Sequence, residues 1–336
     1  MKAFTYRDFP IKVFGIPNFE FHQTLQRLPD ELIATIPSLE FLGRRPAGAR
    51  LGFRTNSRSF TVKIELQTLS IDIGMSIYAC QSAFVFLGER PHSRLLGLVN
   101  PSDYEDKCFQ TTFETSGEME DVTVFLPRNE IIKNVTVLIE DDAQISEPTP
   151  YRYSKPLLFY GSSITEGGIS GNIASGYIPL ISRHLDADYY NLGFSGNAKG
   201  ELEMADFISS LDISAFIYDY DHNAPTVEHL KDTHQPFFNR IREKKPYLPI
   251  VMMSRPYAHY GEDEIKRRAV IKSTYEDAIA KGDKNVYIID GEEYFKGFED
   301  KDLCFIDTIH PTDLGFFKMA EVIEPVIRKI LEGTPK

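Results

Sequence analysis

The second half of the chain alternates short apolar runs with longer amphipathic stretches, and this alternation limits the possible folds more than any other feature. The apolar runs have the length of buried strands and occupy residues 157–160, 189–192, 215–220, 250–254 and 286–290. Helical periodicity lies between and after them, at residues 174–185, 201–210, 227–243, 262–281 and 314–331. Because strand and helix alternate along the chain, the pattern predicts a parallel sheet between layers of helices.

The first 145 residues follow a different pattern. Residues 60–66 alternate between apolar and polar side chains, as expected for a strand with one buried face. Only residues 29–36 suggest a helical turn. Further short apolar runs, separated by Gly, Pro, Asn and Asp, lie at 82–87, 122–126 and 135–139. Short strands with turn signals between them predict an all-β sandwich of the jelly-roll type.

A proline-rich stretch separates these two patterns. Residues 146–156 contain Pro148, Pro150 and Pro156 and have no apolar period, which is typical of a linker. A chain of 336 residues is also long enough for two domains. We therefore predict a β-sandwich domain at residues 1–145, a linker at 146–156 and an α/β domain at 157–336.

Composition and charge exclude several classes of partner. The net charge of −12 argues against nucleic acids and anionic membranes, because both repel an acidic surface. No apolar run approaches the length of a membrane span. Residues 1–8 lack the apolar core of a signal peptide, so we expect a cytoplasmic location, although a trimmed signal would leave the same chain. Metal-ligand spacing is missing from the cysteines and from four of the histidines, namely Cys80, Cys108, Cys304, His222, His229, His234 and His259.

Polar residues follow the predicted strands, at the edge where a parallel sheet binds its ligands. These segments are Gly161-Ser162-Ser163, Gly193-Phe194-Ser195-Gly196-Asn197, residues 219–223, residues 254–257 and Asp307-Thr308-Ile309-His310-Pro311. A serine, a glycine turn, an asparagine and an Asp-x-x-His pair therefore meet at one edge. Acyl transfer needs such parts: a nucleophile, a base, an orienting carboxylate and donors for an oxyanion.

Four of these segments resemble, in the same order, the four sequence blocks of the SGNH (GDSL-type) hydrolases. They are Gly-Ser-Ser-Ile-Thr-Glu-Gly at 161–167, Asn-Leu-Gly-Phe-Ser-Gly-Asn at 191–197, Asp-His-Asn at 221–223 and Asp-Thr-Ile-His-Pro at 307–311. The resemblance covers roughly residues 155–332 and implies a flavodoxin-like three-layer α/β/α domain. The N-terminal half, with Gly-Met-Ser-Ile-Tyr at 74–78, resembles the accessory sandwich that precedes the catalytic domain in one subgroup.

The resemblance implies a role for each site residue. Ser163 would be the nucleophile, His310 its base and Asp307 the acid that orients the base. The oxyanion hole would consist of the backbone amides of Ser163 and Gly196 and the side-chain amide of Asn223. In chemical terms, the imidazole takes the serine proton and the carboxylate fixes its tautomer. No metal or organic cofactor is implied.

Two positions depart from the family pattern, and several alternative interpretations exist. Ser162 stands where the family usually has Asp before the nucleophile, and the segment 221–224 lacks the glycine and aspartate of the third block. Either serine of the turn could be structural, and Gly193 competes with Gly196 as the oxyanion glycine. Asn223 could instead cap a helix that starts near residue 226, and Asp307 could be a plain loop carboxylate, with Asp313 capping the last helix.

The predicted function is that of a serine esterase that acts through an acyl-serine intermediate. We expect a small acyl ester as substrate, with acetyl on a carbohydrate foremost, because no apolar lid suited to long lipids is visible. The same residues could transfer the acyl group to an alcohol if water were excluded. A non-catalytic ligand-binding protein on the same fold is the third interpretation, because fold does not fix function.

Overall fold

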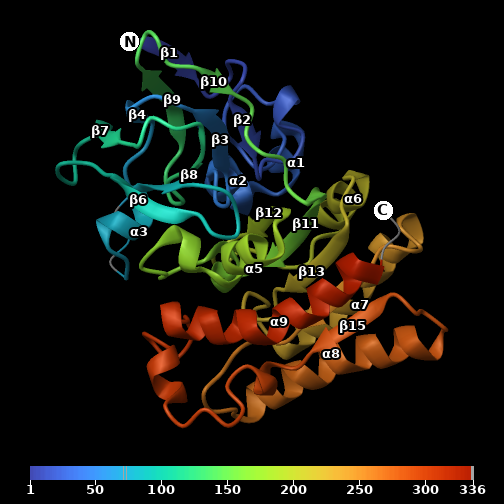
Figure 1. The fold of residues 1–336 in the computed structure, drawn as a ribbon. Coiled ribbons are helices and arrows are strands. Elements are labelled where there is room, and N and C mark those ends of the chain that lie inside the picture. The colour runs from blue at the N-terminus through green and yellow to red at the C-terminus, as the bar shows by residue number, and fades with distance from the viewer. Residues whose placement is uncertain (71, 73, 334–336) are drawn as a thin grey trace.

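Five parallel strands form the centre of the C-terminal half in the computed structural model, which describes residues 1–70, 72 and 74–333 (Figure 1). Their order across the sheet is β12-β11-β13-β14-β15, the 2-1-3-4-5 order of a flavodoxin-like fold. The strands are β11 (Tyr153–Gly161), β12 (Ala187–Gly193), β13 (Ala215–Asp219), β14 (Ile250–Met253) and β15 (Val286–Ile289). The prediction of a parallel sheet is therefore confirmed, although β11 begins four residues before the predicted start.

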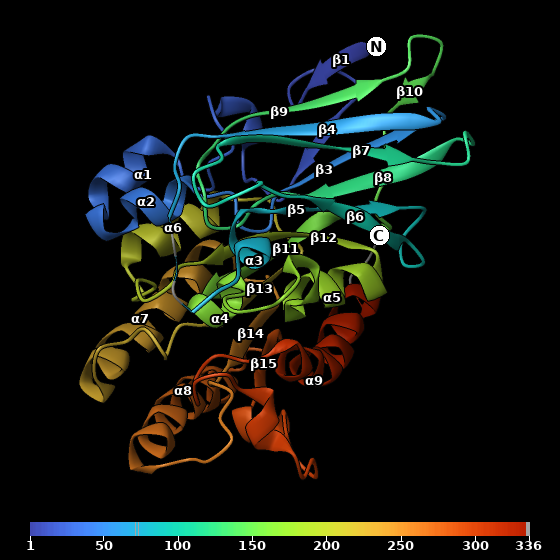
Figure 2. The same cartoon turned by 90° about the vertical axis from the view of Figure 1, so that its left-hand side faces the viewer.

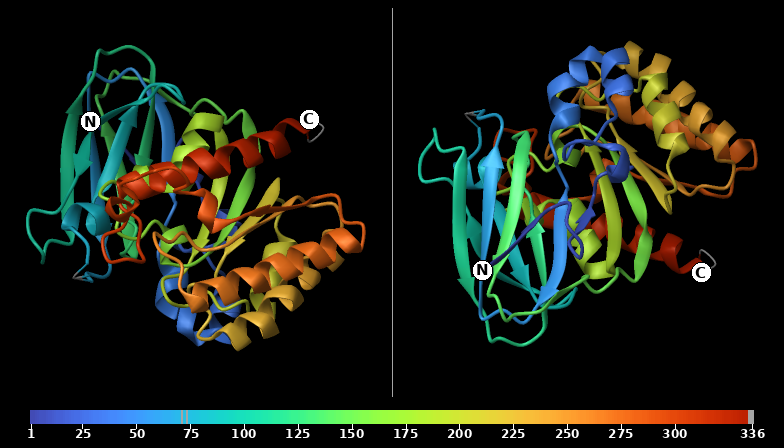
Figure 3. Two further views of the ribbon diagram at one scale, coloured as in Figure 1. Left: turned by 90° about the horizontal axis from the view of Figure 1, so that it is seen from below. Right: turned by 90° about the horizontal axis from the view of Figure 1, so that it is seen from above.

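Helices cover both faces of this sheet, as predicted. On one face, apolar side chains of α5 (Tyr177–Leu185) and α9 (Asp313–Gly333) pack against Leu157 and Phe159 of β11. Side chains of the other helix layer pack against Leu158 and Tyr160, which point to the opposite face. That layer consists of α6 (Leu202–Ser210), α7 (Val227–Lys244) and α8 (Glu262–Ala280). Figure 3 shows α9 lying across its face of the α/β region.

The N-terminal half contains two antiparallel sheets, which confirms the predicted all-β domain. One sheet has the order β1-β9-β4-β7 and consists of β1 (Lys2–Thr5), β9 (Ile132–Ile139), β4 (Ser59–Leu66) and β7 (Cys108–Glu114). The other has the order β10-β3-β8-β5-β6, with β2 (Lys12–Phe14) paired to β3 (Arg50–Thr55). Its remaining strands are β10 (Ile145–Ser146), β8 (Glu120–Phe125), β5 (Ala83–Leu87) and β6 (Arg94–Val99). Buried residues of both sheets, such as Phe53, Phe60 and Val137, share one apolar core.

Most of the segment of residues 19–44 packs on the α/β region, although Leu25 belongs to the core of the sandwich. The segment holds α1 (Asp30–Thr35) and α2 (Glu40–Arg44), and Figure 2 shows both helices beside α6. Its buried residues Leu28, Ile33 and Leu39 belong to the same apolar cluster as α6 and α7. A short helix, α3 (Ile77–Gln81), precedes β5. The domain limits at residues 145 and 156 remain predictions.

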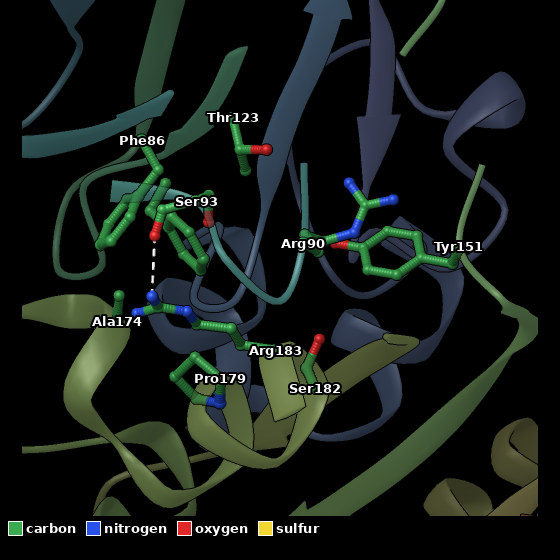
Figure 4. A pocket seen from close by; sticks show the side chains of 10 residues that line it. Phe86, Arg90, Ser93, Thr123, Tyr151, Ala174, Pro179, Ser182 and Arg183 are labelled. Atoms are coloured by element: carbon green, nitrogen blue, oxygen red, sulfur yellow. Dashed lines mark hydrogen bonds between the residues drawn. The ribbon is translucent and has the colours of Figure 1, made fainter. Parts of the chain in front are cut away.

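Charged side chains join the sandwich to the α/β region around the pocket whose lining side chains Figure 4 shows. Arg183 of α5 donates hydrogen bonds to the backbone carbonyls of Pro91, at 3.0 Å, and Ser93, at 2.7 Å. Arg90 reaches back to Asp186 with an N–O distance of 2.8 Å. Its guanidinium lies 3.8 Å from the centre of the Tyr151 ring. No helix in the described part of the chain is long and apolar enough to cross a membrane.

Candidate active site

The turn after β11 presents Ser163 as the first residue of the short helix α4 (Ser163–Glu166). Ser162 is buried and its Oγ accepts a hydrogen bond from the amide of Ile164, at 3.2 Å, so it serves as the N-cap. Gly161 must be glycine, because a Cβ atom there would collide with the carboxylate of Asp219. The two serines therefore differ in environment: Ser162 is a buried cap, whereas Ser163 is partly exposed.

His310 and Asp307 lie against this serine. The Oγ of Ser163 is 2.8 Å from Nε2 of His310, and the ring Nδ1 is 2.7 Å from Oδ2 of Asp307. Oδ1 of Asp307 accepts the backbone amides of Ile309 and His310, at 3.1 and 2.7 Å. With Nδ1–H donated to the carboxylate, Nε2 is left to accept the serine proton. The structure thus brings the predicted nucleophile, base and acid into one hydrogen-bonded chain.

Hydrogen bonds also set the charge of Asp307 and the shape of its loop. Burial raises the pKa of Asp307, but hydrogen bonds from the amide and ring of His310 and the amide of Ile309 outweigh it and lower the pKa below 3.8. Thr308 has a φ of +72°, a strained conformation for a β-branched residue. This strain allows two successive amides to reach the same carboxylate.

The 194–197 turn and Asn223 follow β12 and β13, the two strands on either side of β11. Nδ2 of Asn223 donates to the carbonyl of Phe194, at 2.9 Å, and the amide of Asn197 closes the turn on the same carbonyl. Gly196 has a φ of +70° and open space where a side chain would lie. Among the described residues, the amides of Ser163 and Gly196 have no hydrogen-bond partner. These two amides and the second hydrogen of the Asn223 amide are therefore unoccupied donors.

The structure bears on three of the alternative interpretations, those of Gly193, Asn223 and Asp313. The amide of Gly193 donates to Oδ1 of Asn191, at 2.9 Å, and its Cα packs against the backbone of Glu166, so Gly193 is a packing glycine. Asn223 does not cap α7, since the Oγ1 of Thr226 accepts the His229 amide at 3.1 Å. Asp313 is not a cap either. It is the first residue of α9, and its carboxylate accepts the amide of Gly171 at 3.0 Å.

Two buried carboxyl groups that the sequence did not single out support the site. Asp219, at the end of β13, accepts the hydroxyl of Thr165 and the backbone amide of Ser162. Burial raises the pKa of Asp219 well above 3.8, because the interior disfavours its charged form. Glu166 accepts the amide of Ser195, at 3.1 Å, and the Ser195 hydroxyl. Thr165 and Glu166 lie inside the first sequence block. Their fixed spacing from Ser163 could therefore have identified them as residues that support the site.

The residues at both departures from the family pattern, Ser162 and Asp221, accept hydrogen bonds in the structure. Ser162 supplies the helix cap described above. Asp221, which replaces a glycine, is buried and accepts hydrogen bonds from the backbone amide and Nε of Arg255, at 3.3 and 3.2 Å. The next residue, His222, stacks on Tyr257 with 6.2 Å between ring centres. Burial, with lesser contributions from Arg255 and His310, lowers the pKa of His222 well below 6.5, so its ring is neutral.

Comparisons with known proteins agree with this geometry. The model of the GDSL-like lipase/acylhydrolase family matches residues 154–328. A protein from Bacteroides ovatus described as a GDSL-like lipase is 22% identical with a TM-score of 0.88, and the match covers 98% of each chain. The salicylyl-acyltransferase SsfX3 from a tetracycline biosynthetic pathway is 19% identical with a TM-score of 0.80, covering 99% of this chain and 98% of its own.

The name of a third similar solved structure refers to a carbohydrate substrate. The acetyl xylan esterase Est2A from Butyrivibrio proteoclasticus is 12% identical with a TM-score of 0.61, covering 99% of this chain and 100% of its own. No curated protein matches the chain. At these identities the solved structures establish the fold alone, whereas the family model spans more than half of the chain. The chain therefore belongs to the GDSL-like lipase/acylhydrolase family, the SGNH hydrolases, which are enzymes that act on esters.

Proposed function

We propose that the protein is a serine esterase that hydrolyses small acyl esters through an acyl-Ser163 intermediate. The observation that carries the proposal is the chain from Ser163 to His310 to Asp307, with O–N distances of 2.8 and 2.7 Å, beside unoccupied amide donors. Oγ of Ser163 attacks the ester carbonyl while Nε2 of His310 takes its proton. The protonated imidazole then gives this proton to the leaving alcohol, and water repeats the sequence to release the acid.

The developing oxyanion would be stabilised by the donors that remain unoccupied. The amides of Ser163 and Gly196 and the free hydrogen of the Asn223 amide are fixed by the start of α4, the 194–197 turn and the hydrogen bond to Phe194. Donors held in place before the reaction cost no reorganisation when charge develops. In this role they act on the transition state more strongly than on the bound ester.

Exposure of the acid–base pair supports hydrolysis over transfer. The side chains of His310 and Asp307 are 24% and 47% exposed. Transfer to an alcohol requires that water be kept from the acyl-enzyme, and an open site admits water. The acyltransferase SsfX3 has the same fold, so transfer remains the second candidate and the product analysis below tests it.

A small acyl group on a carbohydrate is the proposed substrate. A long acyl chain gains about 0.8 kcal/mol for each methylene removed from water, which an open site beside exposed polar groups does not provide. The acetyl xylan esterase that shares both domains supports an acetylated sugar. We therefore expect acetyl esters to react faster than longer homologues.

Covalent labelling tests the nucleophile. A fluorophosphonate should modify Ser163 and abolish esterase activity, and peptide mass spectrometry identifies the site. Ser162→Ala is the matched control: it should lose about 0.5–2 kcal/mol of stability with the N-cap but keep labelling and turnover. Ser163→Ala should lose both. Labelling at Ser162, or none in an active preparation, would contradict the proposal.

Product analysis tests the substrate class. Acetylated mono- and oligosaccharides and chromogenic esters of two to eight acyl carbons are compared by kcat/KM, with and without an added alcohol. We expect free acetate as the main product and the highest kcat/KM with acetyl esters. A kcat/KM that rises with acyl chain length would contradict the proposed acetyl group. An alkyl ester as the main product would show that the enzyme is a transferase and not a hydrolase.

A further inference from the structure

One side chain from the N-terminal segment of residues 19–44 reaches the loop that follows β12. Arg27 is fully buried, and all five of its N–H donors have an acceptor. Nη1 donates to the carbonyls of Asn191 and Gly193, at 2.9 and 2.6 Å. Nε and Nη2 donate to the carbonyls of Arg45 and Leu42, at 2.9 and 2.8 Å. Arg27 therefore holds the end of β12 to α2 and to the residue that follows α2.

The same guanidinium contacts the carboxylate that holds the 194–197 turn. Nη2 of Arg27 lies 3.4 Å from Oε1 of Glu166. The other oxygen of Glu166 accepts the amide and hydroxyl of Ser195, the residue before Gly196. The Arg27 guanidinium also lies 4.6 Å from the centre of the Phe194 ring. A continuous set of contacts thus runs from Arg27 through Glu166 and Ser195 to the Gly196 amide.

The ion pair between Arg27 and Glu166 also has an electrostatic effect on the site. The Glu166 side chain is 3% exposed, and an unpaired carboxylate so close to the 194–197 turn would oppose a developing oxyanion. Burial lowers the pKa of Arg27 to about 10, which still leaves it charged at neutral pH. Arg128, also fully buried, interacts electrostatically with the same carboxylate. The negative charge that orients Ser195 is therefore balanced from the N-terminal half of the chain.

We propose that Arg27 is a positioning residue for catalysis, which fixes the Gly196 amide through Glu166 and Ser195. The inference rests on the proposed function, because it assigns the Gly196 amide to the oxyanion. It also makes the N-terminal segment part of the catalytic unit, since the turn lacks its anchor without residue 27. The expected loss is in turnover, because a displaced donor weakens the transition state more than substrate binding.

Arg50 of β3 provides a matched control, because it contacts the same strand, β12, as Arg27 does. It too is a fully buried arginine from the N-terminal half, and it pairs with Asp188 and the carbonyl of Tyr189, at the opposite end of β12. Both arginines thus lose a buried carboxylate partner and backbone contacts when they are replaced. Only Arg27 lies next to the 194–197 turn.

The experiment compares Arg27→Lys, Arg27→Met and the double variant Arg27→Met/Glu166→Gln with Arg50→Met and Arg50→Met/Asp188→Asn. The double variants remove the unpaired charge, so they keep the test valid if a single variant does not fold. Four quantities are measured on the full chain: kcat and KM with a chromogenic acetyl ester, the second-order rate of Ser163 labelling by a fluorophosphonate, and the urea midpoint. The tetrahedral phosphonyl adduct probes the oxyanion donors directly.

Arg27 variants should lower kcat and the labelling rate by about 10- to 100-fold with little change in KM. Arg27→Lys should retain more turnover than Arg27→Met, because it restores the charge beside Glu166. The Arg50 variants should lower the urea midpoint while the folded protein keeps wild-type kcat. Wild-type kcat and labelling in a folded Arg27 variant, or an equal loss in the Arg50 variants, overturns the inference. Absence of labelling in the wild type instead removes the proposed function, and the inference with it.

Discussion

The two halves of the candidate site are held in different ways. On the nucleophile side, the supporting groups are buried and their contacts join distant parts of the chain: Asp219 accepts from Thr165, Glu166 accepts from Ser195, and Arg27 lies against Glu166. On the acid–base side, every hydrogen bond of Asp307 is to a residue at most three positions away, and its side chain is 47% exposed. One half is therefore built by tertiary packing and the other by a local loop.

This difference separates the effects of substitution on rate from those on stability. Exposed local hydrogen bonds contribute little to the free energy of unfolding, so changes on the acid–base side should affect catalysis almost alone. Buried carboxyl groups on the nucleophile side take part in the core, so changes there should affect stability as well. The predictions below test this separation, starting with the largest effect.

Replacement of His310 should give the largest loss of activity. His310→Ala removes the proposed base, and we expect a fall in kcat on the order of 10⁶-fold, as when any essential member of a triad is lost. The urea midpoint should hardly move, because the ring is partly exposed and its two partners, Asp307 and Ser163, remain solvated. The double variant with Ser163→Ala should be no slower than either single variant. Additive losses would show that the two residues do not act as a unit.

Replacement of Asp307 should cost less. In Asp307→Ala the imidazole loses its orienting carboxylate and the loop loses two amide contacts. We expect kcat to fall by at most about 10⁴-fold, because an unoriented imidazole still meets the serine part of the time. Steady-state kinetics of the Asp307→Ala and His310→Ala variants, measured under the same conditions, give the difference in kcat. A loss equal to that of His310→Ala would mean that the loop fails to present the base at all.

Asn223 tests a partly buried side chain on the nucleophile side. Asn223→Ala removes one proposed oxyanion donor and the hydrogen bond to Phe194, and kcat should fall by roughly 10²–10³-fold with little change in KM. Because the residue is only partly buried, stability should change by about 1 kcal/mol. A raised KM with intact kcat would make Asn223 a binding residue, and the oxyanion would then depend on backbone amides alone.

The same difference explains what the sequence could predict. Ser163, Asp307 and His310 lie in short blocks whose spacing is fixed along the chain, so a resemblance between blocks locates them. The contacts of Arg27 with Glu166 and Gly193 join residues more than 130 positions apart, and no local pattern reports them. The packing of residues 19–44 could not be predicted from the sequence, for a related reason. The apolar side chains of its short helices predict burial but do not indicate which of two cores they join.

Several strands of the sandwich were not predicted, and β3 is one of them. Its sequence is Arg-Leu-Gly-Phe-Arg-Thr, in which only Leu51 and Phe53 are large apolar residues, so the apolar pattern is too short to identify a strand. Arg50 is nevertheless fully buried, because Asp188 of the other domain neutralises it. In the α/β region the parallel strands are apolar on both faces, so their runs are continuous and every one of the five was recognised.

The smallest expected effect concerns Asp219 and appears in stability, not in rate. Burial raises its pKa in the folded state well above the 3.8 of the unfolded chain. The stability from this group is therefore complete below pH 3.8 and is lost as the pH rises through the folded-state pKa. Asp219→Asn cannot ionise, yet its amide oxygen can still accept from Thr165. Its free energy of unfolding should rise relative to wild type by at most about 1.4 kcal/mol per pH unit across that interval.

Urea titrations of wild type and Asp219→Asn at matched pH values measure this difference, and other titrating groups cancel because they are common to both proteins. Asp206→Asn is the control on the surface. The side-chain hydrogen bonds from Arg240 and Lys244 lower the pKa of Asp206, so this variant should lose stability relative to wild type as the pH rises toward 3.8 and show no further change above it. The change is opposite in sign to that of Asp219→Asn and lies in the lower pH interval. Parallel curves for Asp219→Asn and wild type would mean that the carboxyl beneath the nucleophile turn keeps its charge in the fold. The turn would then be supported by an ion, and burial would not be what sets the charge of Asp219.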